Sequence, residues 1–186
     1  MFLETERLLL RKFRDEDFED YYAYAADREL NRLMANNDLT RREDALACFN
    51  YLKDKQERGY VIVCKDNGRV IGNLNVTPLP EFLVERDIEE LKGKNGVSLS
   101  FALSRQYWRQ GLMSEAVCAV INHLFQVEGL DFIQCGYLDF NLPSRAFQEK
   151  LGFNPLTTET FSIDGEECHS VENILWRGDW ESCTPQ

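Results

Sequence analysis

A short basic turn between two apolar segments is the part of this sequence best suited to bind a ligand. Residues 97–104 alternate apolar and polar side chains, as a half-buried strand does, and residues 113–127 repeat apolar side chains at helical spacing. Between them lie Arg109, Gln110 and Gly111. The start of a helix presents free backbone N–H groups and the positive end of its dipole, so this turn can bind a diphosphate. A plain structural turn with glycine at a helix entry remains an alternative.

A second polar turn follows further along the chain. Asn141 and Ser144 come after an apolar segment at 132–138, which we predict to be a strand. A short predicted helix at 144–151 then leads into the run Leu151-Gly152-Phe153. Asn and Ser here can bind the amide of a ligand, but the same residues are also an ordinary way to start a helix.

Taken in order, W-R-Q-G-L-M-S-E-A at 108–116, the Asn and Ser turn and the L-G-F run resemble the GNAT N-acetyltransferase superfamily. The opening L-E-T-E-R-L-L-L-R at 3–11 is similar to the start of its bacterial branch that acetylates the N-termini of ribosomal proteins, as are the closing runs D-G-E and W-R-G-D-W. The resemblance covers nearly the whole chain. It implies a single GNAT domain over residues 1–180 and a C-terminal tail at 181–186.

The resemblance implies acetyl-CoA as co-substrate and no metal. It places the diphosphate on the backbone N–H groups of the turn, and the peptide-like pantetheine arm along the second half of the 97–104 strand, where that strand separates from its neighbour at 132–138. One N–H there would hold the thioester oxygen as charge develops. The residues expected to bind acetyl-CoA are Phe101, Ala102, Leu103, Arg109, Gln110, Gly111, Leu112, Met113, Ser114, Asn141 and Ser144. Met113 is bulkier than the family's usual residue, but the backbone does the binding.

The sequence departs from the family's pattern where protons are handled. Ser98 stands where many relatives carry Glu, and Gln148 where many carry Tyr. Ser98, Tyr137 and His169 are the remaining candidates for catalysis, and Tyr107 is a further tyrosine nearby. Half-buried aromatic rings and an exposed histidine explain the same residues. The sequence therefore names no general base and no general acid.

This departure bears on the acceptor. An α-amino group has a pKa near 7.7–8.0 and a lysine side chain near 10.4, so at pH 7 about one α-amine in ten is neutral, against about one lysine in a few thousand. We therefore expect direct attack, in a ternary complex, by the α-amine of a protein or peptide N-terminus or by a small primary amine. Three alternatives stay open: a non-catalytic acyl-CoA-binding module, an acetyltransferase of a polyamine or amine antibiotic, and a purely structural domain.

Composition limits the classes of partner. The net charge of -11 argues against a nucleic-acid surface and favours cationic partners such as amines, although an acidic solvated surface is the simpler explanation. The six cysteines form no C-x-x-C pair and no metal-binding spacing with histidine. We see no signal peptide and no apolar stretch long enough for a membrane, and so expect a reducing cytoplasm. The oligomeric state is open, with a homodimer among the alternatives.

The predicted elements describe a mixed α/β (α+β) chain with 44% hydrophobic residues, enough for one core. We expect a single, mostly antiparallel twisted sheet of about seven strands with helices on both faces, and the resemblance adds central strands splayed for the cofactor. The charged segment 81–95 is predicted to be an insertion with a short helix at 85–91. The acceptor walls are expected at 32–37, 81–95 and 162–169. The predicted strands are 7–13, 60–65, 69–76, 97–104, 132–138, 158–163 and 170–176, and the main helices are 15–27, 40–57, 113–127 and 144–151.

Overall fold

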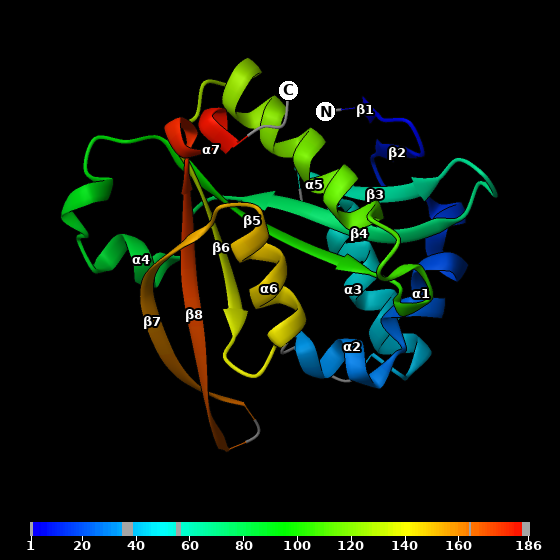
Figure 1. Ribbon diagram of the computed structural model, residues 1–186. Helices are drawn as coiled ribbons and strands as arrows, with labels where there is room; N and C mark the ends of the chain where they lie inside the picture. Colours follow the sequence, from blue (N-terminus) through cyan, green and yellow to red (C-terminus); the bar gives the residue numbers. More distant parts are fainter. Residues whose placement is uncertain (1, 35–38, 55–56, 164, 184–186) are drawn as a thin grey trace. The chain divides into compact units, whose positions relative to one another are not determined.

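The computed structural model describes residues 2–34, 39–54, 57–163 and 165–183 (Figure 1). The chain divides into two compact units. Unit 1 contains Met1–Val76 and Ser100–Asn122, and unit 2 contains Thr77–Leu99 and His123–Gln186. Asp164 of the predicted Asp164-Gly165 turn, and residues 35–37 of the predicted acceptor wall, lie outside the described residues.

The strand order is β1-β2-β3-β4-β5-β6-β8-β7. Strand β5 pairs with β6 in parallel, whereas the pairs β1–β2, β2–β3, β3–β4, β6–β8 and β7–β8 are antiparallel. The mixed, mostly antiparallel fold class is therefore confirmed. Within the described residues the sheet has eight strands rather than about seven, because a two-residue strand, Leu3–Glu4, pairs with β2. The strands are β1 (Leu3–Glu4), β2 (Leu8–Arg11), β3 (Gly59–Cys64), β4 (Val70–Thr77), β5 (Gly96–Leu103), β6 (Phe132–Leu138), β7 (Asn154–Ile163) and β8 (Glu166–Trp176).

The helices differ from the prediction mainly in where they begin and end. They are α1 (Phe18–Ala25), α2 (Arg28–Leu33), α3 (Arg42–Asp54), α4 (Glu81–Glu85), α5 (Leu112–Asn122), α6 (Leu142–Lys150) and α7 (Arg177–Cys183). The helix predicted over 15–27 begins as a 3-10 turn at Asp15–Asp17 and continues as α1 to Ala25. The prediction missed α2, which starts where the Asp27 side chain accepts hydrogen bonds from the N–H groups of Glu29 and Leu30. Such a side-chain acceptor is the usual start of a new helix.

Unit 1 has helices on both faces of its strands (Figure 1). On one face an aromatic cluster, including Tyr21 and Phe49, packs against β-strand residues such as Val61. Leu9 of β2 packs against this cluster, while Leu8 and Leu10 are fully buried. Because side chains alternate along a strand, Leu8 and Leu10 face the opposite side, where α5 contacts β2. The predicted arrangement of helices on both faces is therefore confirmed for unit 1.

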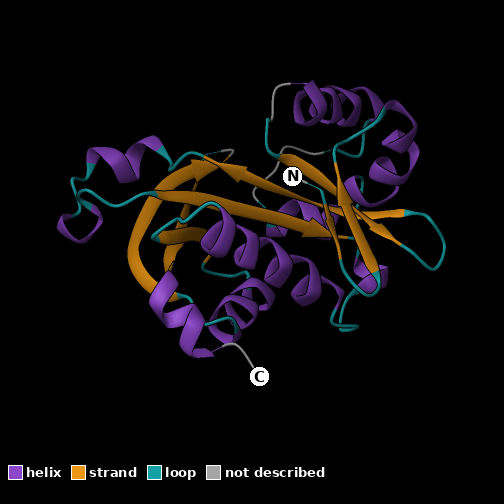
Figure 2. Cartoon of the chain, turned by 90° about the horizontal axis from the view of Figure 1, so that it is seen from above, coloured by secondary structure: helices purple, strands orange, loops and turns teal. Residues whose placement is uncertain are grey.

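Unit 2 is built around the antiparallel strands β6, β7 and β8, which are strongly curved (Figure 2). Helix α6 contacts β6. Strands β7 and β8 begin four residues earlier than predicted, because their polar stretches pair with each other; Thr160, for example, lies opposite His169. The short helix predicted at 85–91 is instead α4 (Glu81–Glu85) followed by a 3-10 turn, since Asp87, with a φ of 50°, ends the helix.

Candidate functional site

The turn before α5 has the backbone conformation of an anion-binding site. Strand β5 ends at Leu103, and the chain passes through two left-handed residues, Arg109 with a φ of 60° and Gly111 with a φ of 77°. Holding a non-glycine residue such as Arg109 in that region costs about 1–3 kcal/mol, and such strain clusters at functional sites. Left-handed residues next to a helix start turn successive N–H groups toward one point, a concavity that suits anions.

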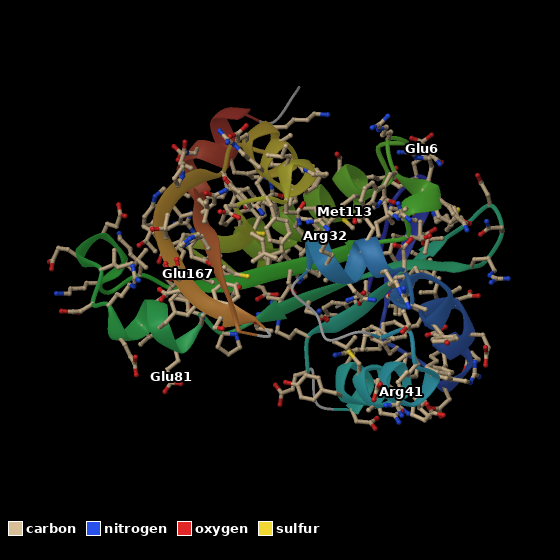
Figure 3. The ribbon with its side chains drawn as sticks, turned by 90° about the horizontal axis from the view of Figure 1, so that it is seen from below. Glu6, Arg32, Arg41, Glu81, Met113 and Glu167 are labelled. Carbon is tan, nitrogen blue, oxygen red and sulfur yellow. The ribbon has the colours of Figure 1, made fainter. Side chains whose placement is uncertain are left out.

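Helix α5 supplies the remaining donors of this turn. The first backbone N–H to find an acceptor in the helix is that of Glu115, which donates to the Gly111 carbonyl at 3.0 Å. A helix leaves the N–H groups of its first turn without intrahelical acceptors. The predicted residues Leu112, Met113 and Ser114 occupy that turn, and Met113 is labelled in Figure 3. The structure therefore brings together the predicted turn residues 109–114 within one short segment of unit 1.

Arg7 holds this turn from the side. Its Nε donates to Glu115 Oε2 at 2.6 Å, its backbone N–H donates to Glu115 Oε1 at 2.8 Å, and its Nη1 donates to the Gln110 carbonyl at 2.9 Å. The Thr5 hydroxyl also donates to Glu115 Oε1, at 2.5 Å. The motif L-E-T-E-R at the start of the chain thus contacts the helix start, a role that its sequence alone does not disclose. We call this contact of Thr5 and Arg7 with Glu115 the Arg7 clamp.

The Arg7 clamp also sets the charge at the turn. Burial works to raise the pKa of the Glu115 carboxyl, but hydrogen bonds from Thr5 and Arg7 outweigh it and hold the pKa below its ordinary value. Glu115 therefore stays ionised and keeps the Arg7 guanidinium beside the turn. A Cβ added to Gly111 would lie 3.5 Å from Arg7 Nη2. An anion at the turn would meet this cation as well as the backbone donors.

The second half of β5 presents its backbone groups on alternate sides. The Ser104 N–H donates to the Ile71 carbonyl of β4 at 2.8 Å, and the Ala102 carbonyl lies so close to Gly72 of β4 that a Cβ there would collide with it. Residues of even number thus face β4, so the backbone groups of Phe101 and Leu103 point the other way. The contact of the pantetheine arm with Phe101, Ala102 and Leu103 stays a prediction, with the backbone groups of Phe101 and Leu103 on the side away from β4.

The end of β5 is bonded to the turn that follows it. The Leu103 carbonyl accepts a hydrogen bond from the Trp108 indole at 2.8 Å. Trp108 therefore ties the end of β5 to the turn that follows. On the other side of this stretch, the pairing of β5 with β6 is described for three residues, Gly96 to Ser98. The predicted separation of β5 from β6 stays a prediction.

In unit 2, Asn141 and Ser144 take part in the start of α6. The Asn141 Oδ1 accepts a hydrogen bond from the Ser144 N–H at 3.1 Å, which makes Asn141 a helix cap. The Ser144 hydroxyl accepts from Gln148 Nε2 at 3.1 Å. Helix capping and cofactor binding use different atoms of Asn141, so the predicted contact with acetyl-CoA stays a prediction.

Gln148, which stands where relatives carry a tyrosine, is a fully buried structural residue. Its Oε1 accepts a hydrogen bond from Asn173 Nδ2 at 3.0 Å, and its Nε2 lies 3.4 Å from the Gly136 carbonyl. It thus joins α6 to β6 and β8. A neutral amide does not ionise, so Gln148 cannot act as the acid that the tyrosine would supply.

The three sequence candidates for catalysis are not on one face of the sheet. Ser98 lies opposite Gln134 in the β5–β6 register, whereas Tyr137 lies opposite Val171 and belongs to the other face of β6. His169 is about half exposed and its Nδ1 lies 3.0 Å from the Thr160 hydroxyl. The structure therefore does not assemble Ser98, Tyr137 and His169 into a catalytic group.

A buried carboxylate that the sequence prediction missed lies on the same face as Ser98. Glu172 of β8 is only 6% exposed. It accepts hydrogen bonds of 2.5 Å from Gln134 Nε2 and from the Ser170 hydroxyl. The available signal was a Glu close to the apolar residues Ile174 and Leu175.

The described residues contain no group of His, Cys, Asp and Glu side chains that could hold a metal ion. The five cysteines within that part of the chain are free: Cys48, Cys64, Cys118, Cys135 and Cys168. No helix among the described residues is long and apolar enough to cross a membrane.

Comparison with known proteins decides the family. A family model described as an acetyltransferase (GNAT) domain matches residues 7–154, a range that includes the turn before α5 and the Asn141 turn. The chain belongs to the GNAT acetyltransferase family. Its activity class is accordingly that of an acetyl-CoA-dependent N-acetyltransferase. The family also accounts for the backbone-built turn, which suits the diphosphate of CoA.

Individual GNAT proteins support this assignment. The chain is 28% identical over 156 residues to the protein named Uncharacterized N-acetyltransferase p20 of Bacillus licheniformis, with 81% of each covered. A GNAT acetyltransferase structure from Bacillus anthracis matches with a TM-score of 0.78 at 20% identity, covering 96% of this chain and 99% of that one.

Two further solved structures have the same fold and named acceptors. The ribosomal-protein-S5-alanine acetyltransferase from Vibrio fischeri has a TM-score of 0.67 at 19% identity, with 100% of both chains covered. The spermidine N-acetyltransferase from Vibrio cholerae, solved with CoA and spermine, has a TM-score of 0.72 at 14% identity, covering 95% of this chain and 99% of that one. At these identities the matches show the fold and leave the acceptor of this chain open.

Proposed function

We propose that this chain acts as one GNAT domain over residues 1–180 and transfers the acetyl group of acetyl-CoA to the α-amine of a protein or peptide N-terminus. Attack is direct, within a complex that holds both substrates. The observation that carries the cofactor half of the proposal is the turn before α5, where left-handed Arg109 and Gly111 expose the N–H groups of the helix start. The neighbouring Arg7 clamp adds a fixed cation.

The choice of acceptor rests on proton chemistry. The pKa of an α-amine is about 2.5 units lower than that of a lysine side chain. At a given pH well below both values, the neutral fraction of the α-amine is therefore about 10² to 10³ times larger, so it depends much less on a base supplied by the enzyme. Ser98 offers no carboxylate of its own at the position where relatives carry one. Positioning and stabilisation of the thioester oxygen by a β5 N–H, from Phe101 or Leu103, can then supply most of the rate. The similarity in fold to an S5-alanine acetyltransferase agrees with this choice, while the similarity to a spermidine acetyltransferase keeps polyamines as the second candidate.

An acceptor panel tests the proposal. Thiol release from acetyl-CoA is measured with peptides bearing free N-termini, with Nα-acetyl-lysine and with spermidine, and acetyl-CoA binding is measured by calorimetry. We expect binding, and turnover with at least one free peptide N-terminus at pH 8. Turnover with spermidine alone would move the acceptor to polyamines. Binding without turnover on any amine would instead indicate an acyl-CoA-binding module, and absence of binding would contradict the cofactor site.

A further inference from the structure

The carboxylate of Asp27 connects the start of α2 to the segment that follows β5. Its Oδ1 accepts hydrogen bonds from the backbone N–H groups of Glu29 at 3.0 Å and Leu30 at 3.1 Å, and so caps α2. Its Oδ2 accepts a hydrogen bond from Arg105 Nε at 2.7 Å. Arg105 begins a 3-10 turn, Arg105–Tyr107, which lies between β5 and the turn before α5. All of these residues belong to unit 1, and we call the contacts of Asp27 with α2 and Arg105 the Asp27 bridge.

Helix α2 depends on this cap. It has six residues, Arg28–Leu33, and a helix of that length is not stable in water by itself. Buried side chains, among them Leu30 and Asn31, hold it against the rest of unit 1, and Asn31 Nδ2 donates to the Ala25 carbonyl at 2.8 Å. These contacts fix where α2 lies. The Asp27 carboxylate fixes how its first turn is oriented, because it binds two of the N–H groups there.

The charge of Asp27 links the two halves of the bridge. Burial works to raise the pKa of the Asp27 carboxyl, but the hydrogen bonds from Arg105 and from the Leu30 N–H outweigh it and hold the pKa below its ordinary value. Asp27 is therefore ionised at neutral pH. An ionised acceptor makes stronger hydrogen bonds than a neutral one, so each set of donors favours the state of Asp27 that the other set needs. Arg105 thus strengthens the cap of α2, and the cap strengthens the contact with Arg105.

The segment between β5 and α5 is held together by hydrogen bonds of its own. The Trp108 indole donates to the Leu103 carbonyl at 2.8 Å, and Gln110 Nε2 donates to the Gln106 carbonyl at 3.0 Å. The two bonds together span residues 103–110, and Arg105 lies within that span. A change in backbone conformation at the turn before α5 therefore reaches Arg105, and through it the bridge.

We propose that Arg105 is a positioning residue for the acceptor. Through Asp27 it holds the first turn of α2, and with it the acceptor wall that is predicted to begin at Arg32, which is labelled in Figure 3. This inference rests on the proposed function. Arg105 itself touches neither substrate, and its effect is carried by the position of α2.

The bridge also couples the two substrates. Acetyl-CoA bound at the turn before α5 fixes the segment that carries Arg105, and this favours the capped position of α2. A ligand that favours the state to which a second ligand binds raises the affinity for that second ligand, and the effect is reciprocal. We therefore expect the acceptor and acetyl-CoA to bind with positive coupling that depends on Arg105.

Arg105→Gln tests the proposal by separating the effects on the two substrates. The ion pair is about half exposed on the arginine side, so we expect the KM for a peptide acceptor to rise by about fivefold, the upper range for such a pair. The binding constant for acetyl-CoA alone, from calorimetry, should stay within about twofold. Deuterium exchange gives a readout that is independent of turnover: acetyl-CoA should slow exchange at the Glu29 and Leu30 amides in the wild type but not in Arg105→Gln.

Three further variants make the test specific. Asp27→Asn keeps an oxygen for the cap but removes the charge, and the double variant with Arg105→Gln should be no worse than either single one, because both break the same contact. Arg105→Lys keeps the cation and should restore part of the acceptor KM. Arg42→Gln is the matched control, since Arg42 is a half-exposed arginine of unit 1 that pairs with Glu19. It should leave the acceptor KM and the exchange of α2 within about twofold. Thermal unfolding establishes that each variant is folded.

The outcomes separate this inference from the proposed function. If the wild-type protein releases no thiol with any amine, the proposed function fails and the acceptor role of Arg105 fails with it, while exchange still shows whether α2 responds to acetyl-CoA. If the wild type is active and Arg105→Gln leaves the acceptor KM unchanged, the ion pair is a surface contact only and the inference is overturned. Equal losses for both substrates, or additive effects of Arg105→Gln and Asp27→Asn, would overturn it as well.

Discussion

The turn before α5 in unit 1 and a polar cluster in unit 2 are two polar regions that are built differently. The cluster, here called the Glu172 cluster, lies on one face of β5, β6 and β8 and consists of Ser98, Gln134, Gly136 and Glu172. The turn consists of backbone N–H groups, whose direction is fixed by Gly111 and by the start of a helix. The cluster consists of side chains that three strands bring together by register. A site of the first kind tolerates most side-chain changes but not a change in backbone conformation. A region of the second kind loses its hydrogen bonds when a single polar group is replaced.

Gly111→Asp should have the largest effect on the turn. Aspartate combines a side chain that disfavours a φ of 77° with a negative charge beside the predicted diphosphate. We expect acetyl-CoA to bind at least about 100-fold more weakly, equivalent to about 2.7 kcal/mol, as measured by calorimetry. Gly93→Asp is the matched control, because Gly93 has a φ of 68° and open space around it. Equal losses in both variants, or none in a folded Gly111→Asp, would contradict the assignment of the turn.

Glu115→Gln should break the Arg7 clamp without changing the shape of the side chain. Hydrogen bonds to a charged group contribute about 1.5–3 kcal/mol each, so we expect a loss of about 2 kcal/mol of unfolding free energy at pH 7. The pKa of Glu115 is lower in the folded state, so its contribution is present above the unfolded pKa and is lost as the pH falls through the folded pKa.

Urea unfolding at several pH values measures this difference. The gap in unfolding free energy between wild type and Glu115→Gln should shrink between pH 5 and pH 3. Glu90→Gln, at an exposed residue of a 3-10 turn, should show no comparable gap. A gap for Glu115→Gln that stays constant with pH would show that the clamp does not depend on the ionised carboxylate.

The two roles of Asn141 can be separated by a pair of variants. Asn141→Ala should cost about 1 kcal/mol of stability, because the cap of α6 is lost. Asn141→Asp keeps an acceptor for the Ser144 N–H but loses the amide donor predicted to meet the pantetheine. If that contact exists, both variants should raise the KM for acetyl-CoA by about tenfold, and only Asn141→Ala should unfold more easily. A normal KM in Asn141→Asp would leave Asn141 as a helix cap alone.

The smallest effects are expected at the residues that sequence suggested for catalysis. Tyr107→Phe, Tyr137→Phe and His169→Ala should each change kcat by well under the roughly 100-fold that removal of a true acid or base produces. Steady-state rates over a range of pH provide the measurement. A rate profile with a break near pH 6.5 that disappears in His169→Ala would make His169 the base.

The sequence predicted the turn before α5 but not the Glu172 cluster, because only the turn is built from consecutive residues. The turn occupies consecutive residues, and a basic, glycine-containing segment between an alternating strand and a periodic helix is visible in the sequence itself. The fold class and most strands were predictable for the same reason, since periodicity is a local signal. Helix α2 was missed because its start depends on the Asp27 side chain inside a longer periodic segment.

The Glu172 cluster and the Arg7 clamp depend on partners distant in sequence. Glu172 meets Gln134 only through the register of β6 with β8, and Arg7 meets Glu115 only after α5 has packed on β2. A one-residue shift in register would turn Glu172 to the other face. No local pattern specifies such pairings, so a Glu close to the apolar residues Ile174 and Leu175 was the most that the sequence could indicate.

The hydrogen bond from the Arg7 backbone to the Glu115 carboxylate makes the start of the chain a reporter for events at α5. An amide hydrogen exchanges with solvent only when its bond opens, and a ligand that binds the closed form makes such openings rarer. Acetyl-CoA held at the first turn of α5 should therefore slow deuterium uptake at Arg7, even though the cofactor need not touch that residue. Mass spectrometry of the peptide spanning residues 3–11 would then read cofactor occupancy without any acetyl transfer.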